Sequence, residues 1–196
     1  MTGTSGHGRA IIVVDPQPDF FEGGALAIAG ATGTAQRIAE FLRECAEEYD
    51  ALIVTQDWHV DPGEHWSSDP NFVTTWPMHC AAGTDGANIH FSLVDQPWDL
   101  VIRKGLHEGA YSGFDGVSEN DAPLFDELNN AGIHKVTVVG FATDHCVKAT
   151  ALDARRLGFD VEVILDLCAG VAPETTQSAI LEMRGAGITA TTRDLR

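Results

Sequence analysis

Short apolar runs alternate with amphipathic segments along most of the chain. The apolar runs are rich in β-branched or aliphatic side chains and lie at Ala10–Val14, Ala51–Thr55, Leu100–Arg103, Val136–Gly140, Val161–Leu165 and near Ile188–Thr192. Continuous runs of this kind are typical of strands that are covered on both faces, as in a parallel sheet. The pattern therefore predicts a sheet whose strands are separated by other elements.

The segments between these runs have the spacing of helices. In residues 34–49, the apolar side chains Ile38, Phe41 and Leu42 recur at three- and four-residue steps and form one helix face. Further helices are predicted at 123–131, 144–157 and 173–186, each followed by a glycine that can end it. Alternating strands and helices indicate an α/β fold with a parallel, or mostly parallel, central sheet and helices on both faces.

The domain organisation follows from the same pattern. The chain has 196 residues and contains no internal repeat, low-complexity tract or linker. We therefore expect one domain over residues 10–196, preceded by a disordered or flexible N-terminus at residues 1–9.

The composition of the chain excludes some classes of function and indicates the cellular compartment. The chain carries 12 basic and 29 acidic residues, a net charge of −17. This balance argues against nucleic-acid binding, which needs a basic stripe, and against docking on an anionic membrane. The N-terminus lacks the apolar core of a signal peptide, and no apolar run approaches the ~18 residues of a membrane span. A cytoplasmic location is expected, with the four cysteines as free thiols.

Reactive side chains follow four of the predicted strands. Asp15 comes directly after the first strand, Asp57 after the second, Lys104 after the third, and Cys146 in the turn after the fourth. Ligands in open α/β sheets bind beyond the carboxyl ends of the strands. We therefore expect two acids, an amine and a thiol to converge in one crevice.

Cys146 is a candidate nucleophile because it lies where a strand turns into a helix. The positive end of the helix dipole and the exposed backbone amides there favour a thiolate and can hold an oxyanion. Asp15 could act as general base and then general acid, and Lys104 could stabilise both neighbours. The alternatives are a small buried hydrophobe at Cys146, a structural carboxylate at Asp15 and a simple ion pair at Lys104.

The segment from Gln56 to Pro97 shows no clear helix or strand and is unusually rich in His and Trp. Long structureless loops in compact domains are usually functional. Its polar residues Asp57, His59, His65 and His79 are of the types that bind zinc, iron or manganese, although surface histidines in a polar loop are the alternative. Aromatic residues nearby, among them Phe20 and Trp76, could enclose a flat ring or simply pack in the core.

Five motifs in order give the chain a specific resemblance. They read IIVVDPQPDFFEGGALAIAGA, TQDWHVDPGEHW, WPMHCAAGTDGA, KGLHEGAYSGF and VVGFATDHCVKATALDA, and they span nearly the whole chain. Together they resemble the nicotinamidase/pyrazinamidase branch of the isochorismatase-like cysteine hydrolases. The resemblance implies the isochorismatase-like hydrolase fold. It also implies a metal-containing amidohydrolase that converts nicotinamide, and pyrazinamide, to the carboxylic acid and ammonia in NAD salvage.

The resemblance also implies a role for each matching residue. Cys146 would be the nucleophile that forms a thioester, Asp15 the proton-transfer residue and Lys104 the third member of the triad. The backbone amides of Ala142 and Cys146 would form the oxyanion hole, with a cis peptide bond between Phe141 and Ala142. The metal ligands would be Asp57, His59, His65 and His79, and the substrate-binding residues Phe20, Trp76, Tyr111 and Phe141.

The metal would be one divalent ion, with zinc expected first and iron or manganese as alternatives, and it would bind the pyridine nitrogen of the substrate. The expected partner is a small aromatic amide, and the chain could be a monomer or a homo-oligomer. One departure from the family is the presence of Pro16 and Pro18 between Asp15 and Phe20. The two prolines fix the backbone and remove two amide donors, which affects the shape of the loop at the pocket mouth, and Pro16 favours an extended backbone at Asp15.

Two other functions stay open at this point. The first is an isochorismatase-like amidase acting on another small amide or ureido substrate. The second is a metallohydrolase in which the ion activates water and Cys146 is inert.

Overall fold

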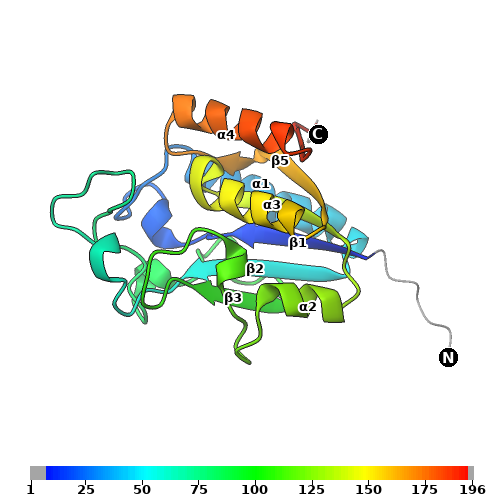
Figure 1. Cartoon of the computed structure of the whole chain (residues 1–196), viewed down its shortest axis with the longest axis horizontal. Helices are drawn as coiled ribbons and strands as arrows, with labels where there is room; N and C mark the ends of the chain where they lie inside the picture. Colours follow the sequence, from blue (N-terminus) through cyan, green and yellow to red (C-terminus); the bar gives the residue numbers. More distant parts are fainter. Residues whose placement is uncertain (1–7, 194–196) are drawn as a thin grey trace.

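A computed structural model describes residues 8–193, and its elements follow the alternation expected from the sequence. They are β1 (Arg9–Val14), α1 (Ala31–Cys45), β2 (Ala51–Asp57), β3 (Leu100–Lys104), α2 (Leu124–Asn130), β4 (Lys135–Phe141), α3 (Lys148–Arg156), β5 (Asp160–Ala169), α4 (Pro173–Gly185) and β6 (Thr189–Thr191) (Figure 1). The flexible N-terminus expected at residues 1–9 falls mostly on residues 1–7, outside the described residues. Arg9 already belongs to β1.

All six strands form one parallel sheet in the order β3-β2-β1-β4-β5-β6. The predicted parallel sheet is therefore confirmed. β1 lies in the middle, and the order reverses there, because β2 and β3 extend to one side and β4 to β6 to the other. A crevice forms outside the carboxyl ends of the strands at such a reversal.

The sheet separates two apolar cores, as expected for helices on both faces. Side chains of α2, α3 and α4 pack on one face, where Leu128 and Met183 are fully buried. Helix α1 packs on the other face through Ile38 and Phe41, together with the loops that follow β1 and β2. Strands covered on both sides explain why the sequence shows continuous apolar runs rather than alternation.

The segment between β2 and β3 is ordered although it contains no long helix or strand. It has two short 3-10 helices, Gly63–His65 and Asp85–Ala87, and a bridge pairs Trp66 with Trp76. Backbone hydrogen bonds join His59 to Cys80 across it. These contacts fold the long loop over the carboxyl edge of the sheet.

Every described helix is too short or too polar to cross a membrane.

The loop between β1 and α1 is closed by the carboxylate of Glu22. That carboxylate accepts hydrogen bonds from the Thr32 hydroxyl, from the Thr32 amide at 3.0 Å and from the Gly30 amide at 2.6 Å. The Thr32 hydroxyl, followed by the backbone donors, lowers the pKa of Glu22 to about 2. Glu22 thus satisfies amides at the start of α1, where a negative charge is favoured.

We expect Glu22→Gln to destabilise the protein near neutral pH, where Glu22 is ionised. The pKa of Glu22 in the folded state lies below its ordinary value of 4.5. The ionised carboxylate therefore contributes fully to the free energy of unfolding above pH 4.5, and this contribution is lost as the pH falls toward about 2. Urea unfolding of parent and variant across this range tests the prediction. A stability difference that does not change with pH would contradict it.

Candidate active site

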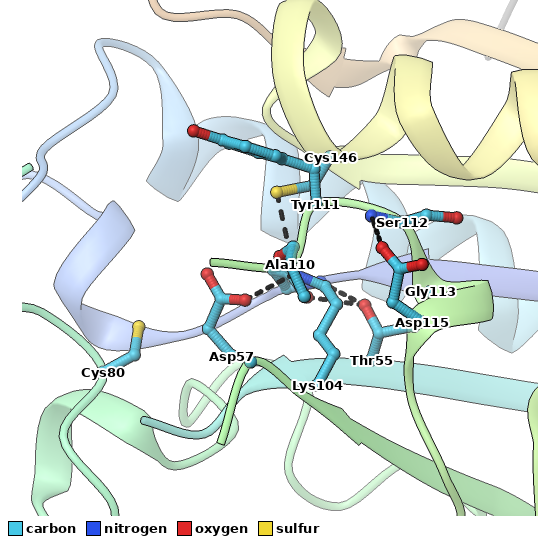
Figure 2. A network of polar contacts seen from close by, with 12 residues as sticks. Thr55, Asp57, Cys80, Lys104, Ala110, Tyr111, Ser112, Gly113, Asp115 and Cys146 are labelled. Atoms are coloured by element: carbon cyan, nitrogen blue, oxygen red, sulfur yellow. Dashed lines mark hydrogen bonds and ion pairs between the residues drawn. The ribbon is translucent and has the colours of Figure 1, made fainter. Parts of the chain in front are cut away.

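Side chains from four strand ends meet at the carboxyl edge of the sheet around Lys104, and Figure 2 shows Lys104 extending toward Asp57 and Cys146. Its Nζ is 2.9 Å from Asp15 Oδ2, 2.5 Å from Asp57 Oδ1 and 3.7 Å from Cys146 Sγ. The acids and the thiol are also mutual neighbours, with one ligand atom of each within 4.8 Å of the others. The convergence expected from the sequence is therefore present.

Asp15 is held by its neighbour on β2. The Thr55 hydroxyl donates to Asp15 Oδ1 at 2.6 Å and accepts from the Asp15 amide at 3.1 Å. The expectation of an extended backbone at Asp15 is wrong, because its φ is +47°. Asp15 is followed by a tight turn centred on Pro16, in which the Gln17 amide donates to the Asp15 carbonyl at 2.8 Å.

Lys104 is fully buried and stays charged. Burial opposes the charge, but the carboxylates of Asp15 and Asp57 outweigh burial and raise the pKa of Lys104 well above its ordinary value. The Ala110 carbonyl also accepts a hydrogen bond from Nζ at 3.1 Å. The ammonium therefore neutralises two buried acids and faces the thiol at the same time.

Cys146 lies in a π-helical turn, Thr143–Val147, immediately before α3. The expectation that this place favours a thiolate is wrong for the resting protein. Burial raises the pKa of Cys146 well above its ordinary value, and although Lys104 opposes this, Asp15 and Asp57 add to it. The resting group is a thiol, so a nucleophilic attack needs a base that takes its proton.

Asp15 is the base within reach. Its burial raises the pKa of the carboxyl group, while Lys104 and the Thr55 hydroxyl lower it. A raised carboxyl pKa brings the group closer to the operating pH, as general acid–base catalysis requires. The geometry can therefore move one proton between sulfur and carboxylate.

Asp144 fixes the turn that carries Cys146. Its carboxylate accepts from the amides of Val171 at 2.9 Å and Ala172 at 3.2 Å, and from the Thr175 hydroxyl at the start of α4. The peptide bond between Phe141 and Ala142, just before the turn, is cis, as the resemblance implied. Ala142 and Cys146, the two expected oxyanion-hole residues, line the same cavity.

A second polar cluster adjoins the first. Ring nitrogens of His59, His65 and His79 lie within 4.8 Å of one another. Asp57 faces both clusters: Oδ1 binds Lys104, while Oδ2 is 3.8 Å from His59 Nε2 and 3.9 Å from His79 Nε2. Asp57 thus adjoins a cluster that contains the three expected histidine ligands.

The donor set fits a divalent metal. His59 Nε2 is buried and has no hydrogen-bond partner among the described residues. The Nδ1 atoms of His59 and His79 lie 2.5 and 2.7 Å from the carbonyls of Gly105 and Pro77, which directs each Nε2 toward the cluster. Burial first, and then the neighbouring rings, lower the pKa of His65 to about 4, so its ring is neutral. Neutral imidazoles oriented by backbone carbonyls are typical metal ligands.

Two glycines make room for these rings. A Cβ atom at Gly105 would lie 2.6 Å from His59 Cε1, and one at Gly109 would lie 2.6 Å from His65 Nδ1. Gly105 also has a φ of +74°, which favours glycine. The motif KGLHEGAYSGF therefore supplies both Lys104 and the space beside the histidines.

We expect His59→Ala to weaken metal retention at least about tenfold, because it removes one of the buried candidate ligands. His107→Ala is the matched control, since His107 is an exposed histidine of the neighbouring loop. Elemental analysis after dialysis against a metal-free buffer tests the prediction. Equal metal content in the two variants would place the ion elsewhere.

The two clusters open into one cavity of about 310 Å³. The expected substrate-binding residues Phe20, Trp76 and Tyr111 line it. The inclusion of Phe141 is wrong, because its side chain is fully buried and packs on Phe21, with ring centroids 5.2 Å apart. The sequence places Phe141 next to the oxyanion-hole residue, but the last residue of β4 points into the core.

Comparison with known proteins assigns the family. Residues 9–194 match the model of the Isochorismatase domain. The chain belongs to this isochorismatase family. Within it, the chain is 48% identical to a nicotinamidase/pyrazinamidase of Mycobacterium tuberculosis over 92% of this chain and 96% of that protein. It is 36% identical to a nicotinamidase of Escherichia coli over 92% and 93%.

Solved structures of isochorismatase-family proteins agree with the fold. A pyrazinamidase of Pyrococcus horikoshii in complex with zinc matches with a TM-score of 0.82 and 34% identity, covering 94% of this chain and 99% of that chain. PnC1 from L. infantum in complex with nicotinate matches with a TM-score of 0.82 and 31% identity, covering 96% and 94%.

The isochorismatase-family site includes residues that the sequence analysis missed. Thr55 binds Asp15, and Gln17 clamps the Asp57 backbone by accepting from its amide at 2.8 Å and donating to its carbonyl at 2.7 Å. Thr55 lies within the apolar strand β2, and Gln17 follows the apolar strand β1 closely. A polar side chain in such a place is costly unless it has a partner, and this signal could have revealed both residues. The cavity is also lined by Leu26, Ile28, Phe72 and Val171, for which the sequence gives no such signal.

Proposed function

We propose that this protein hydrolyses nicotinamide, and pyrazinamide, to the carboxylic acid and ammonia. The observation that carries the proposal is the position of Cys146, 3.7 Å from Lys104 Nζ and beside Asp15, in a small aromatic-lined cavity next to the histidine cluster. The names of the two relatives, nicotinamidase/pyrazinamidase and nicotinamidase, support the same substrate class.

The first half-reaction forms a thioester on Cys146. Asp15 takes the thiol proton as sulfur attacks the carboxamide carbon, and the carbonyl oxygen becomes an oxyanion that the amides of Ala142 and Cys146 stabilise. Asp15 then gives the same proton to the carboxamide nitrogen, the carbon–nitrogen bond breaks, and ammonia leaves. Lys104 keeps the buried site electrically balanced while the proton moves between sulfur and carboxylate.

The second half-reaction releases the acid. Asp15 takes a proton from water, the water oxygen attacks the thioester carbon, and the carbon–sulfur bond breaks. The proton on Asp15 returns to sulfur, which regenerates the resting thiol. Each half-reaction thus uses Asp15 once as a base and once as an acid.

Asp57, His59, His65 and His79 would hold the divalent ion, and we propose zinc because this oxygen and nitrogen donor set suits it. The ion bound in the pyrazinamidase of Pyrococcus horikoshii supports this choice. When bound, the metal would supply a Lewis acid that accepts the lone pair of the pyridine nitrogen. This chain's own residues, Phe20 and Trp76, then enclose the aromatic ring.

The same chemistry indicates a cellular role. Hydrolysis of nicotinamide returns the free acid for resynthesis of the cofactor, so we propose a place in NAD salvage. We also propose a cytoplasmic location, because a nucleophilic thiol must stay reduced.

The proposal is tested by incubating the purified, metal-loaded protein with nicotinamide and measuring ammonia and nicotinate together. We expect the two products in equal amounts, and we expect pyrazinamide to give pyrazinoate in the same way. Failure of the folded, metal-loaded protein to release ammonia from either amide would contradict the proposed function.

A further inference from the structure

Phe72 combines two features that are unusual for a large apolar residue. Its side chain is 59% exposed, and its backbone has a φ of +55°. A bulky residue in the left-handed region is strained, and such strain concentrates at functional sites. The Phe72 ring is therefore held in a position that is unfavourable in two ways, because an apolar side chain is exposed to water and the backbone is strained.

The neighbouring residue Asn71 holds the loop in this conformation. Its side-chain oxygen accepts from the amides of Val73, Thr74 and Thr75 at 2.9, 2.8 and 3.0 Å. The Phe72 amide donates to the Thr75 carbonyl at 3.1 Å. These bonds fix the tip of the loop, so the direction of the Phe72 ring is determined locally.

The ring extends the aromatic wall of the cavity toward solvent. Phe72 packs edge-on against Trp76, with centroids 6.3 Å apart and an interplanar angle of 82°. Trp76 in turn donates to the Tyr111 hydroxyl at 3.0 Å and packs against His145 at 5.2 Å. Phe72 is thus the outermost ring of a connected wall whose inner end is beside Cys146.

Other apolar residues complete the mouth of the cavity. Ala25, Leu26 and Ala27, from the loop after β1, and Val171, from the loop after β5, line the same cavity. Val171 is 51% exposed. In a chain with a net charge of −17, an uncharged rim from three separate loops is a distinctive surface.

We infer that Phe72 is a specificity-determining residue that closes the mouth of the cavity over single-ring amides. The inference rests on the proposed function. With the ring nitrogen of nicotinamide directed to the histidine cluster and its carboxamide directed to Cys146, ring position 5 points away from both. A substituent at ring position 5 therefore points toward the mouth of the cavity, where the Phe72 side chain lies.

The size of the cavity agrees with this role. At about 310 Å³, it lies at the lower end of the roughly 300–1,000 Å³ range of ligand pockets. A single-ring amide therefore fits, and the edge of the Phe72 ring adds contact with it. A second ring on position 5 has to displace Phe72.

The test compares nicotinamide with 5-phenylnicotinamide, which keeps the reacting groups and adds one ring. Phe72→Ala removes the ring, and Phe72→Gly removes it while also relieving the backbone strain. Val73→Ala is the matched control, because Val73 is 69% exposed on the same loop and lines a different groove. Binding is measured by calorimetry in a Cys146→Ala background, and kcat/KM in the parent background.

We expect both Phe72 variants to bind nicotinamide more weakly and 5-phenylnicotinamide more tightly. The ratio of the two affinities should shift about tenfold or more, with the change in turnover appearing in KM rather than kcat. Val73→Ala should leave the ratio unchanged.

An unchanged ratio in both Phe72 variants would overturn the inference. Absence of ammonia release by the parent would instead contradict the proposed function, while the binding ratio would still decide the role of Phe72. The two failures are therefore distinguishable.

Discussion

Replacing Cys146 with alanine is expected to reduce ammonia release from nicotinamide by at least about 10⁴-fold, because the reaction loses its nucleophile. The change removes one sulfur atom from a buried turn and leaves Asp144 and its hydrogen bonds in place. The variant should therefore fold, retain metal and bind nicotinamide. Steady-state ammonia release, with metal content and circular dichroism measured on the same sample, tests this.

Cys168→Ala is the matched control for this experiment. Cys168 is a half-buried free cysteine on β5 that does not line the cavity, and it should be replaceable without loss of turnover. Turnover that survives in Cys146→Ala would exclude the thioester and favour a metal-activated water. Turnover lost equally in both variants would indicate a loss of folding.

Replacing Lys104 with methionine is expected to destabilise the protein by about 3–5 kcal/mol near neutral pH and to abolish turnover. The change leaves Asp15 and Asp57 buried without their shared cation, and uncompensated buried charge is costly. With the cation gone, burial and mutual repulsion raise the pKa values of both acids. The stability deficit should therefore shrink as the pH falls and the carboxylates become protonated.

Lys148→Met provides the comparison. Lys148 pairs with Glu182 at 3.3 Å, and both side chains are substantially exposed, so its loss should cost only about 0–1 kcal/mol. Urea unfolding of both variants at equal metal loading, at neutral and mildly acidic pH, measures the difference. Equal stability of the two variants would show that Lys104 does not balance the buried acids.

The positions of the reactive residues were predictable from the sequence. Parallel strands end at one edge of the sheet, so polar residues at or shortly after the ends of four buried strands had to converge, and Lys104 Nζ lies within 3.7 Å of Asp15, Asp57 and Cys146. The strands could be predicted from the sequence because burial on both faces of the sheet leaves continuous apolar runs. The family motifs then assigned the roles that geometry alone leaves open.

The protonation state of Cys146 and the identity of the residues that line the cavity could not be predicted from the sequence in this way. The protonated state of Cys146 results from the burial of that atom and from two nearby carboxylates, which depend on side-chain packing. The left-handed backbone of Asp15 runs against the extended conformation that the following Pro16 favours, and the sequence carries no signal for it. Phe141 is close to the nucleophile in sequence but its ring is buried in the core, whereas Phe72, which is far from the nucleophile in sequence, lines the cavity.

The proposed mechanism depends on attack of the Cys146 sulfur on a carbonyl carbon, and an aldehyde isolates this step. Pyridine-3-carbaldehyde presents a carbonyl at the same ring position but has no leaving group, so the reaction stops at the first adduct. With the carbonyl carbon labelled with ¹³C, nuclear magnetic resonance distinguishes a thiohemiacetal from the free aldehyde and from its hydrate. We predict a bound thiohemiacetal in the parent that is absent in Cys146→Ala. A bound hydrate in both proteins would contradict attack by sulfur and assign the attack to water.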